Sequence, residues 1–354
     1  RSVYADPVFR VRVDLMTVGI LREGPPGVPG NWTSLGAEQA VDGAWFYASK
    51  DFLARGRRLL WGWVEIGHGC LSLPREITWH AELRQLVFSP VPELALLRAQ
   101  PLGRLEASPL PTNASVPLGC ADAAEVHAVF ERPARPARLG VYVAADYPGA
   151  NSRSSGFWYF VDYVPPPPNE PAAAYNVTVG RTRLPLSPGR YARVMPGFDL
   201  YGADYNASHA SYSDFRVCEA ACNTNATCVA WTFVPGQCLL KSAVPFIITR
   251  LPGATSGVKD PASLEDSRVT RQLALLPSDR FLEVHVFVDA FAEGFFQGGR
   301  VALTTPITPF SNENPGEGNC LGVLATSSGV RLAQADAWAV GDIWKSEAEL
   351  RQGG

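Results

Sequence analysis

Tryptophans and aspartates near the start of the sequence are the residues whose chemistry suits a carbohydrate. Trp45, Trp61 and Trp63 could form a platform for a saccharide, because aromatic faces fit the C–H surfaces of pyranose and furanose rings. Burial of these aromatic residues in a β-structure is the more common explanation. Two aspartates in the same part of the sequence, Asp6 and Asp42, could each supply a carboxylate to such a site and are considered below.

Other catalytic chemistries have no support in the sequence. Its histidines show neither HExxH nor His-x-His spacing, so we predict no metal site and treat them as structural residues; they are His68, His80, His127, His209 and His285. The glycine signatures of phosphate and dinucleotide binding are absent, as is Gly-x-Ser-x-Gly. We therefore expect no cofactor.

Composition indicates a mainly β protein. The 354 residues include 30 prolines and 32 glycines, and 10% are aromatic. Short apolar runs broken by proline and glycine are hard to place in long helices, so β-propellers and β-sandwiches are the expected fold classes. The net charge of -3, with 18% charged residues, argues against nucleic acid or an anionic membrane as partner.

Glycosylation sequons and the absence of a long apolar run suggest a secreted protein, extracellular or in the vacuolar lumen. The sequence begins without Met and without a leader-like apolar segment, so we expect its start to be a processed or truncated end. Asn-x-Ser/Thr sequons occur at Asn31, Asn113, Asn176, Asn206 and Asn225.

Disulfides are the favoured role of the seven cysteines. Four of them, Cys218, Cys222, Cys228 and Cys238, are close in sequence and near the sequon at Asn225. A zinc site is the rival hypothesis. It is disfavoured because the spacings fit no common zinc finger and the only nearby imidazole is His209.

One segment resembles a known family of glycosidases. Residues 41–63, VDGAWFYASKDFLARGRRLLWGW, are similar to the last propeller-blade segment of glycoside hydrolase family 32, the invertases and fructan hydrolases. The similarity continues through residues 70–79 and 85–98, which resemble the family's exit from the propeller. The resemblance implies partial propeller blades followed by a β-sandwich.

The resemblance also implies a division of the chain. Residues 1–72 are expected to be the carboxyl-terminal remnant of a five-bladed propeller and residues 73–98 its connection to the sandwich. The sandwich is assigned to residues 99–190 and 260–345, with strands at 121–130, 139–144, 157–164, 281–289 and 330–338.

Residues 191–259 resemble a PAN/apple domain, a small disulfide-stapled α+β fold. This resemblance implies disulfides Cys218–Cys238 and Cys222–Cys228, and the spacing of Cys218 and Cys222 puts both on one helix face. Of the remaining cysteines, Cys120–Cys320 is a third candidate pair and Cys70 is left over.

We expect the PAN-like domain to be an insertion in a sandwich loop, so that residues 175–186 and 281–289 share one sandwich. A tandem arrangement of the two domains is the alternative.

The family's catalytic motifs are not intact in this sequence. Val3–Phe9 is the closest remnant of the acid/base motif, with Ala5 at the position of the glutamate and Asp6 as a weak candidate beside it. Asp6 is otherwise a turn aspartate before proline. By resemblance, Asp42 reaches the sugar end of the pocket, but Trp45 replaces its basic partner. A solvated turn carboxylate is the alternative for Asp42.

Three functions remain open. The chain could be part of a secreted hydrolase of sucrose or fructans whose catalytic blades are missing, and it would then be inactive alone. It could be a non-catalytic module that binds a fructose-containing saccharide through Asp42, Trp45 and Trp61, or a glycan or protein through the PAN-like domain. It could also be a structural or adhesive module in which the PAN-like domain does the binding.

Overall fold

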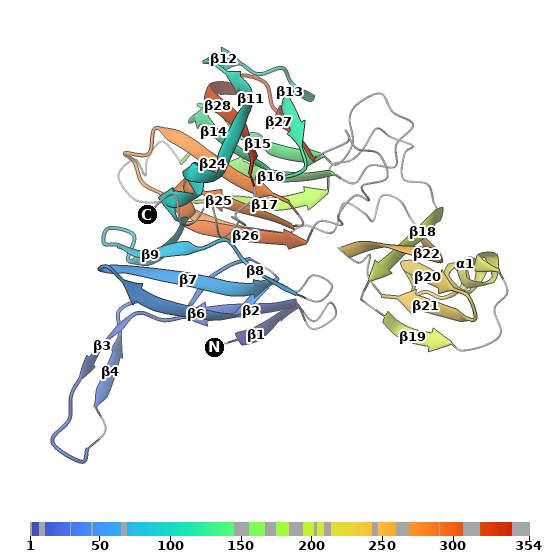
Figure 1. Cartoon of the computed structure of the whole chain (residues 1–354), viewed down its shortest axis with the longest axis horizontal. Coiled ribbons are helices and arrows are strands. Elements are labelled where there is room, and N and C mark those ends of the chain that lie inside the picture. Colours follow the sequence, from blue (N-terminus) through green and yellow to red (C-terminus); the bar gives the residue numbers. More distant parts are fainter. Residues whose placement is uncertain are drawn as a thin grey trace, which may run out of the picture.

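The protein consists of a propeller-like sheet, a β-sandwich and a small α+β lobe (Figure 1). The computed structural model describes residues 2–6, 11–28, 30–43, 45–64, 69–144, 156–166, 175–183, 194–201, 204–208, 214–242, 247–259, 269–289, 291–306 and 319–341. The mainly β architecture agrees with the prediction from composition.

The amino-terminal part forms an eight-stranded sheet in the order β1-β2-β6-β7-β9-β10, with β5 beside β2 and β8 beside β7. The hairpin of β6 and β7 turns at Arg55 and Gly56, which both have positive φ, as a two-residue turn between twisted strands requires. The strands are β1 Ser2–Asp6, β2 Val11–Met16, β5 Gln39–Ala40, β6 Phe46–Ala54, β7 Arg57–Val64, β8 Cys70–Leu71, β9 Arg75–His80 and β10 Gln85–Pro90.

A bulge interrupts β6 where it meets β7. The register shifts between Tyr47 and Lys50, and Ala48 has a φ of 51°. The side chain of Asp14 accepts hydrogen bonds from the backbone N–H groups of Ala48 (3.2 Å) and Ser49 (2.5 Å). A buried carboxylate thus satisfies donors of the bulged segment.

A two-stranded ribbon extends away from this sheet (Figure 1). It consists of β3 Gly19–Arg22 and β4 Asn31–Ser34. Large apolar side chains on it are exposed, among them Leu21 and Trp32.

The propeller-like sheet continues further than the sequence predicts. Strands β9 and β10 extend it to Pro90, whereas the family resemblance implies that the propeller part ends at residue 72. A single 3-10 helix, η1 (Pro92–Leu97), then leads to the sandwich. Leu94 belongs to one buried hydrophobic cluster with Phe287 and Phe295 of the sandwich, and this cluster lies at the junction between the two parts.

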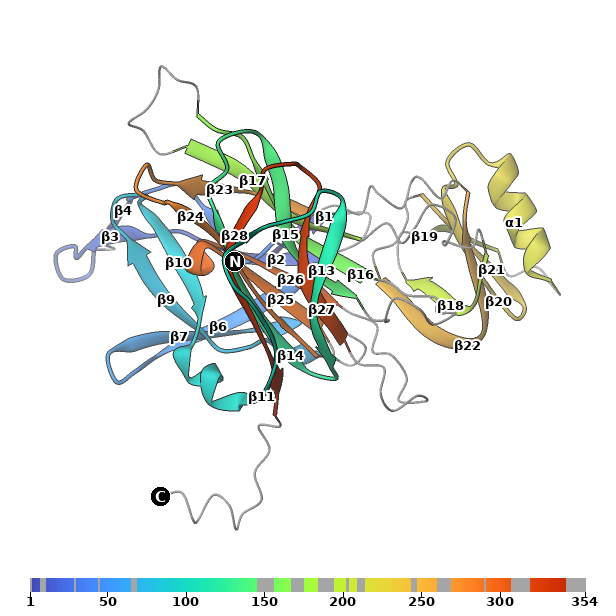
Figure 2. The same ribbon diagram turned by 90° about the horizontal axis from the view of Figure 1, so that it is seen from above.

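Two antiparallel sheets pack face to face in the sandwich (Figures 1 and 2). The seven-stranded sheet, in the order β11-β28-β14-β24-β25-β26 with β12 beside β28, contains β11 Arg98–Leu105, β12 Ser108–Pro109, β14 Ala124–Glu131, β24 Phe281–Val288, β25 Phe291–Phe296, β26 Val301–Pro306 and β28 Arg331–Val340. The six-stranded sheet, in the order β13-β27-β15-β16-β17-β23, contains β13 Ala114–Ala121, β15 Ala137–Ala144, β16 Gly156–Tyr163, β17 Tyr175–Arg183, β23 Val269–Leu275 and β27 Asn319–Ala325. The turn η3, Gln297–Gly299, joins β25 and β26.

Alternation along the strands decides which side chains form the sandwich core. In β14, Val126, Ala128 and Phe130 are fully buried, and the residues between them point to the other face of the sheet. Strands β17 and β24 lie in different sheets but contribute to this one core. The segments before and after residues 191–259 therefore belong to one sandwich.

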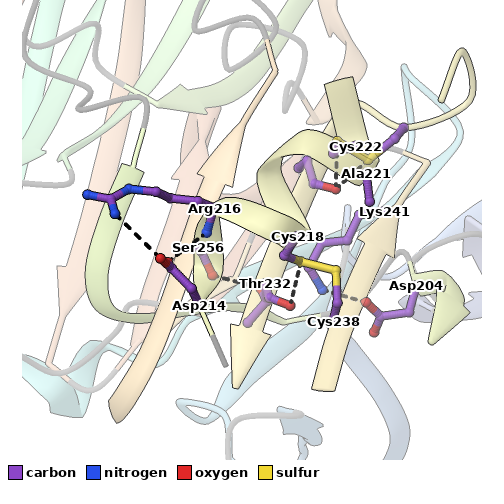
Figure 3. Close-up of a disulfide and its surroundings, with 12 residues drawn as sticks. Asp204, Asp214, Arg216, Cys218, Ala221, Cys222, Thr232, Cys238, Lys241 and Ser256 are labelled. Carbon is purple, nitrogen blue, oxygen red and sulfur yellow. Dashed lines mark hydrogen bonds and ion pairs between the residues drawn. A yellow bond between two sulfur atoms is a disulfide. The ribbon is translucent and has the colours of Figure 1, made fainter. Parts of the chain in front are cut away.

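The small lobe has a five-stranded sheet in the order β18-β22-β20-β21-β19, covered by one helix (Figures 1 and 3). Its elements are β18 Val194–Tyr201, β19 Asp204–Ser208, α1 Phe215–Thr224, β20 Ala230–Val234, β21 Gln237–Lys241 and β22 Ile247–Val258. Asp214 caps α1 by accepting a hydrogen bond from the N–H of Arg216 (3.0 Å).

Disulfides staple both the lobe and the sandwich. Cys218–Cys238 joins α1 to β21 (Figure 3), and Cys222–Cys228 closes the loop after α1. Cys120–Cys320 links β13 to β27, and Cys70 carries no disulfide. All three predicted pairings are confirmed, and the zinc hypothesis for the cysteines is wrong.

Candidate functional site

Asp42 lies inside the protein, between the propeller-like sheet and the sandwich. Its side chain has no exposed surface. Oδ1 accepts a hydrogen bond from the N–H of Thr304 (2.8 Å), and Oδ2 accepts from Oγ1 of Thr304 and Nη2 of Arg75 (both 2.8 Å). A saccharide could reach this carboxylate only if β26 and Arg75 released it.

Arg75 holds a second buried carboxylate, Glu293 of β25. Its Nε lies 3.1 Å from Oε2 of Glu293, its Nη2 binds the same oxygen, and the N–H of Leu73 donates to Oε1 at 2.6 Å. The guanidinium also lies over the ring of Phe46, 4.2 Å from its centroid. One arginine thus ties β9 to the sandwich through two carboxylates.

The electrostatics of this triad follow from its complete burial. Burial lowers the pKa of Arg75, but the charges of Glu293 and Asp42 outweigh this effect and raise it. Burial raises the pKa of Glu293, and the guanidinium of Arg75 opposes the rise. Since Asp42 and Glu293 bind the same guanidinium, neither is placed as a nucleophile or proton donor for a substrate.

The tryptophans proposed as a platform do not lie together. Trp45 is buried in the sandwich core, with a φ of 64°. The segment before it is docked on β26, because the N–H of Gly43 donates to the carbonyl of Ala302 (2.9 Å) and a side chain on Gly43 would collide with Leu303. The core interpretation therefore describes Trp45.

Trp61 and Trp63 lie on a more open face of β7. The ring of Trp61 is stacked on that of Phe52, with centroids 5.1 Å apart and planes inclined by 9°. Phe52 is 46% exposed and Trp63 38% exposed. Because Trp61 and Trp63 are two residues apart on one strand, their side chains point to the same face. Three aromatic side chains, one of which the sequence analysis did not single out, thus share one surface.

The remaining candidates lie on the surface or outside the described side chains. The backbone of Asp6 ends β1, but its side chain lies outside the described part of the structure. Four sequon asparagines are exposed and the fifth is half-buried, so all are accessible to modification; they are Asn31, Asn113, Asn176, Asn206 and Asn225.

The described residues hold neither a metal-binding cluster nor a membrane-spanning helix. Within them, no three side chains of histidine, cysteine, aspartate or glutamate group around a possible metal position. Across the same ranges, no helix has the length and hydropathy needed to span a bilayer.

Comparison with protein families matches residues 198–243 to the PAN domain. Comparison with curated proteins gave no match. Among solved structures, fructan 1-exohydrolase IIa from Cichorium intybus is similar, with a TM-score of 0.54 and 17% identity over 94% of this chain and 56% of that chain. A second structure of that enzyme, a variant in complex with 1-kestose, has a TM-score of 0.51 and 17% identity over 86% of this chain and 50% of that chain.

The similarity covers sheet and sandwich together, but this chain spans about half the length of the enzyme structures that it matches. The PAN match lies within the lobe whose helix and sheet the two disulfides connect. The chain therefore has a glycoside hydrolase family 32 fold into which a PAN domain is inserted.

Proposed function

We propose that this chain is the non-catalytic half of a secreted protein that hydrolyses O-glycosyl bonds in fructose-containing saccharides such as sucrose or fructans. The observation that carries the proposal is the fold: it matches about half of a fructan exohydrolase. The catalytic carboxylates would then belong to a part of the protein outside this chain. Three disulfides and surface sequons support an extracellular or vacuolar-lumenal location.

The buried carboxylates support the view that this half does no chemistry alone. Retaining hydrolysis needs one free carboxylate as nucleophile and one carboxyl group as proton donor. Asp42 and Glu293 are close to each other, but both bind Arg75, and neither side chain is accessible to a substrate. Their role in the proposed function is to hold the propeller-like sheet on the sandwich.

Activity measurements test this division of labour. Residues 1–354, purified free of host invertase, should hydrolyse neither sucrose nor inulin above background. The missing acid/base assistance alone is worth about 10²–10⁴-fold. Turnover that disappears on Asp6→Asn would overturn the proposal, because it would show a catalytic carboxylate within this chain.

The transcript gives a second, independent test. An open reading frame that continues upstream of Arg1 and encodes the two catalytic motifs of family 32 is the expected result. A signal peptide joined directly to Arg1 would contradict the proposal and favour a non-catalytic binding protein.

Saccharide binding is the alternative function that a specific observation favours. Phe52, Trp61 and Trp63 present partly exposed rings on one sheet face, and such rings provide apolar contact area for the C–H face of a sugar. In affinity electrophoresis, a gel that contains inulin should retard the Trp63→Ala variant less than the unmodified chain. Trp79→Ala is the matched control, because Trp79 is 41% exposed on β9; equal mobility of both variants would exclude this surface.

A further inference from the structure

Two histidines lie side by side on the face of the seven-stranded sandwich sheet that points away from the sandwich core. His127 on β14 and His285 on β24 are direct partners in the antiparallel register, and their ring centroids lie 4.8 Å apart. The residues that flank them, such as Val126 and Val284, are fully buried in the sandwich core. Both imidazoles therefore point to the opposite face of the sheet.

Each imidazole binds a carboxylate on the neighbouring strand. Nε2 of His127 lies 2.8 Å from Oε1 of Glu283, and Nε2 of His285 lies 2.7 Å from Oε1 of Glu125. Glu125 also accepts two hydrogen bonds from Arg98, from Nη2 at 2.7 Å and from Nε at 2.9 Å. The four side chains from β14 and β24 form one connected group.

The state of Glu125 determines where His285 can take up a proton. Burial raises the pKa of Glu125, but hydrogen bonds from Arg98 and His285 outweigh it and lower the pKa to about 2. Glu125 is therefore ionised between pH 5.5 and 7, and Nε2 of His285 must donate to it. A further proton can only bind at Nδ1 and converts the ring to imidazolium.

The histidine pair contacts the junction between the propeller-like sheet and the sandwich. Arg98 directly follows η1, and its guanidinium lies 3.8 Å from the ring centroid of Trp338. The ring of His285 lies 4.5 Å from that of Phe287. Phe287 in turn belongs to the same buried hydrophobic cluster as Leu94 of η1. A change of charge on His285 thus acts on side chains that hold the junction.

Further charged groups face the pair from the surrounding elements. Asp336 of β28 is the register partner of His127 and lies 3.6 Å from Arg104. The positive charge of Arg300, which follows η3, helps to lower the pKa of Glu283. Burial lowers the pKa of His285; its contact with Glu125 opposes this effect, and the neighbouring His127 adds to it. The folded protein therefore favours the neutral form of His285.

We propose that the His127–His285 pair is a pH-sensitive contact that weakens the junction between the propeller-like sheet and the sandwich when the surroundings become acidic. A histidine whose pKa is lower in the folded than in the unfolded state stabilises the fold above its unfolded pKa of about 6.5. This stabilisation is lost as the pH falls through the folded pKa. One such group raises the unfolding equilibrium constant by up to about tenfold per pH unit in that window.

The experiment compares His285→Gln with the unmodified chain at pH 7.0 and 5.5. Glutamine can still donate an N–H to Glu125 but takes up no proton. In urea unfolding, the unfolding equilibrium constant of the unmodified chain should rise between pH 7.0 and 5.5. The rise should be up to about tenfold larger than that of the variant. Hydrogen exchange of residues 91–105, corrected for the intrinsic effect of pH, should show the same difference at the junction.

His80→Gln is the matched control, because His80 lies on β9 and accepts a hydrogen bond from the N–H of Leu83. The proposal is overturned if His285→Gln keeps the acid sensitivity of the unmodified chain, or if His80→Gln reduces it equally. Should His285→Gln fail to fold, His127→Gln serves instead. Removing His127 raises the pKa of His285 and must reduce the acid sensitivity; an unchanged slope would contradict the proposal.

Discussion

A substitution of Arg75 should show how much more a buried ion pair contributes to stability than an exposed one. Arg75→Leu removes the partner of two carboxylates whose side chains are at most 1% exposed. Breaking one buried pair costs about 3–5 kcal/mol, because the remaining charge stays desolvated. With Asp42 and Glu293 both affected, we expect a loss of about 5 kcal/mol or more, a large part of the 5–15 kcal/mol typical of a folded protein.

The assay is urea unfolding at pH 7, followed by tryptophan fluorescence. Arg58→Leu is the control, because Arg58 pairs with Asp51 on the surface and its side chain is 63% exposed. Such surface pairs contribute about 0–1 kcal/mol. Losses of similar size in the two variants would refute the argument that burial decides the effect.

A pH series sharpens the same test. Without Arg75, nothing in the triad opposes the effect of burial on Glu293, so its folded-state pKa rises further above the unfolded value. A group with a raised folded pKa stabilises the fold at low pH and loses this contribution as the pH rises. The loss caused by Arg75→Leu should therefore be smaller at pH 5 than at pH 7, and a loss that grows on acidification would contradict this mechanism.

Three further predictions concern other parts of the fold. Glu125→Gln should lower the free energy of unfolding by up to about 3 kcal/mol at pH 7, because Arg98 lowers the pKa of Glu125 from 4.5 to about 2 against the effect of burial. This stabilisation is lost as the pH falls from 4.5 towards 2. Acid titration of the unmodified chain and of the variant should therefore show a stability difference that shrinks over this range. Cys222→Ala together with Cys228→Ala should cost about 2–4 kcal/mol, seen in calorimetry as a lower transition temperature of the PAN lobe alone. Deletion of residues 197–259 should leave the sandwich folded, with an unchanged sandwich transition in the same calorimetric scan.

The sequence predicts the local part of this structure well. The alternation in β14 and β24 identifies which side chains enter the sandwich core, because the side-chain period of a strand is two residues. The PAN resemblance predicts the disulfides Cys218–Cys238 and Cys222–Cys228, which the structure confirms. Both inferences depend on short stretches of chain.

The buried triad could not be predicted in the same way. Arg75 and Glu293 are 218 residues apart. The periodicity of side chains within a strand does not predict which distant strand lies next to it. Asp42 looks like a solvated turn carboxylate in the sequence because its partners, Thr304 and Arg75, come from other elements. The sequence leaves both interpretations of Trp45 open for the same reason, because the core residues around it come from distant strands. Tertiary contacts decide whether such residues meet a substrate or the core.

The Cys120–Cys320 bond has a consequence for the integrity of the polypeptide. Its two cysteines are 200 residues apart and enclose the whole PAN lobe together with its own two disulfides. A protease that cuts once anywhere between them produces two pieces that stay covalently joined through this bond. Release of the lobe requires one cut on each side of it, after which the two sandwich pieces remain linked through β13 and β27.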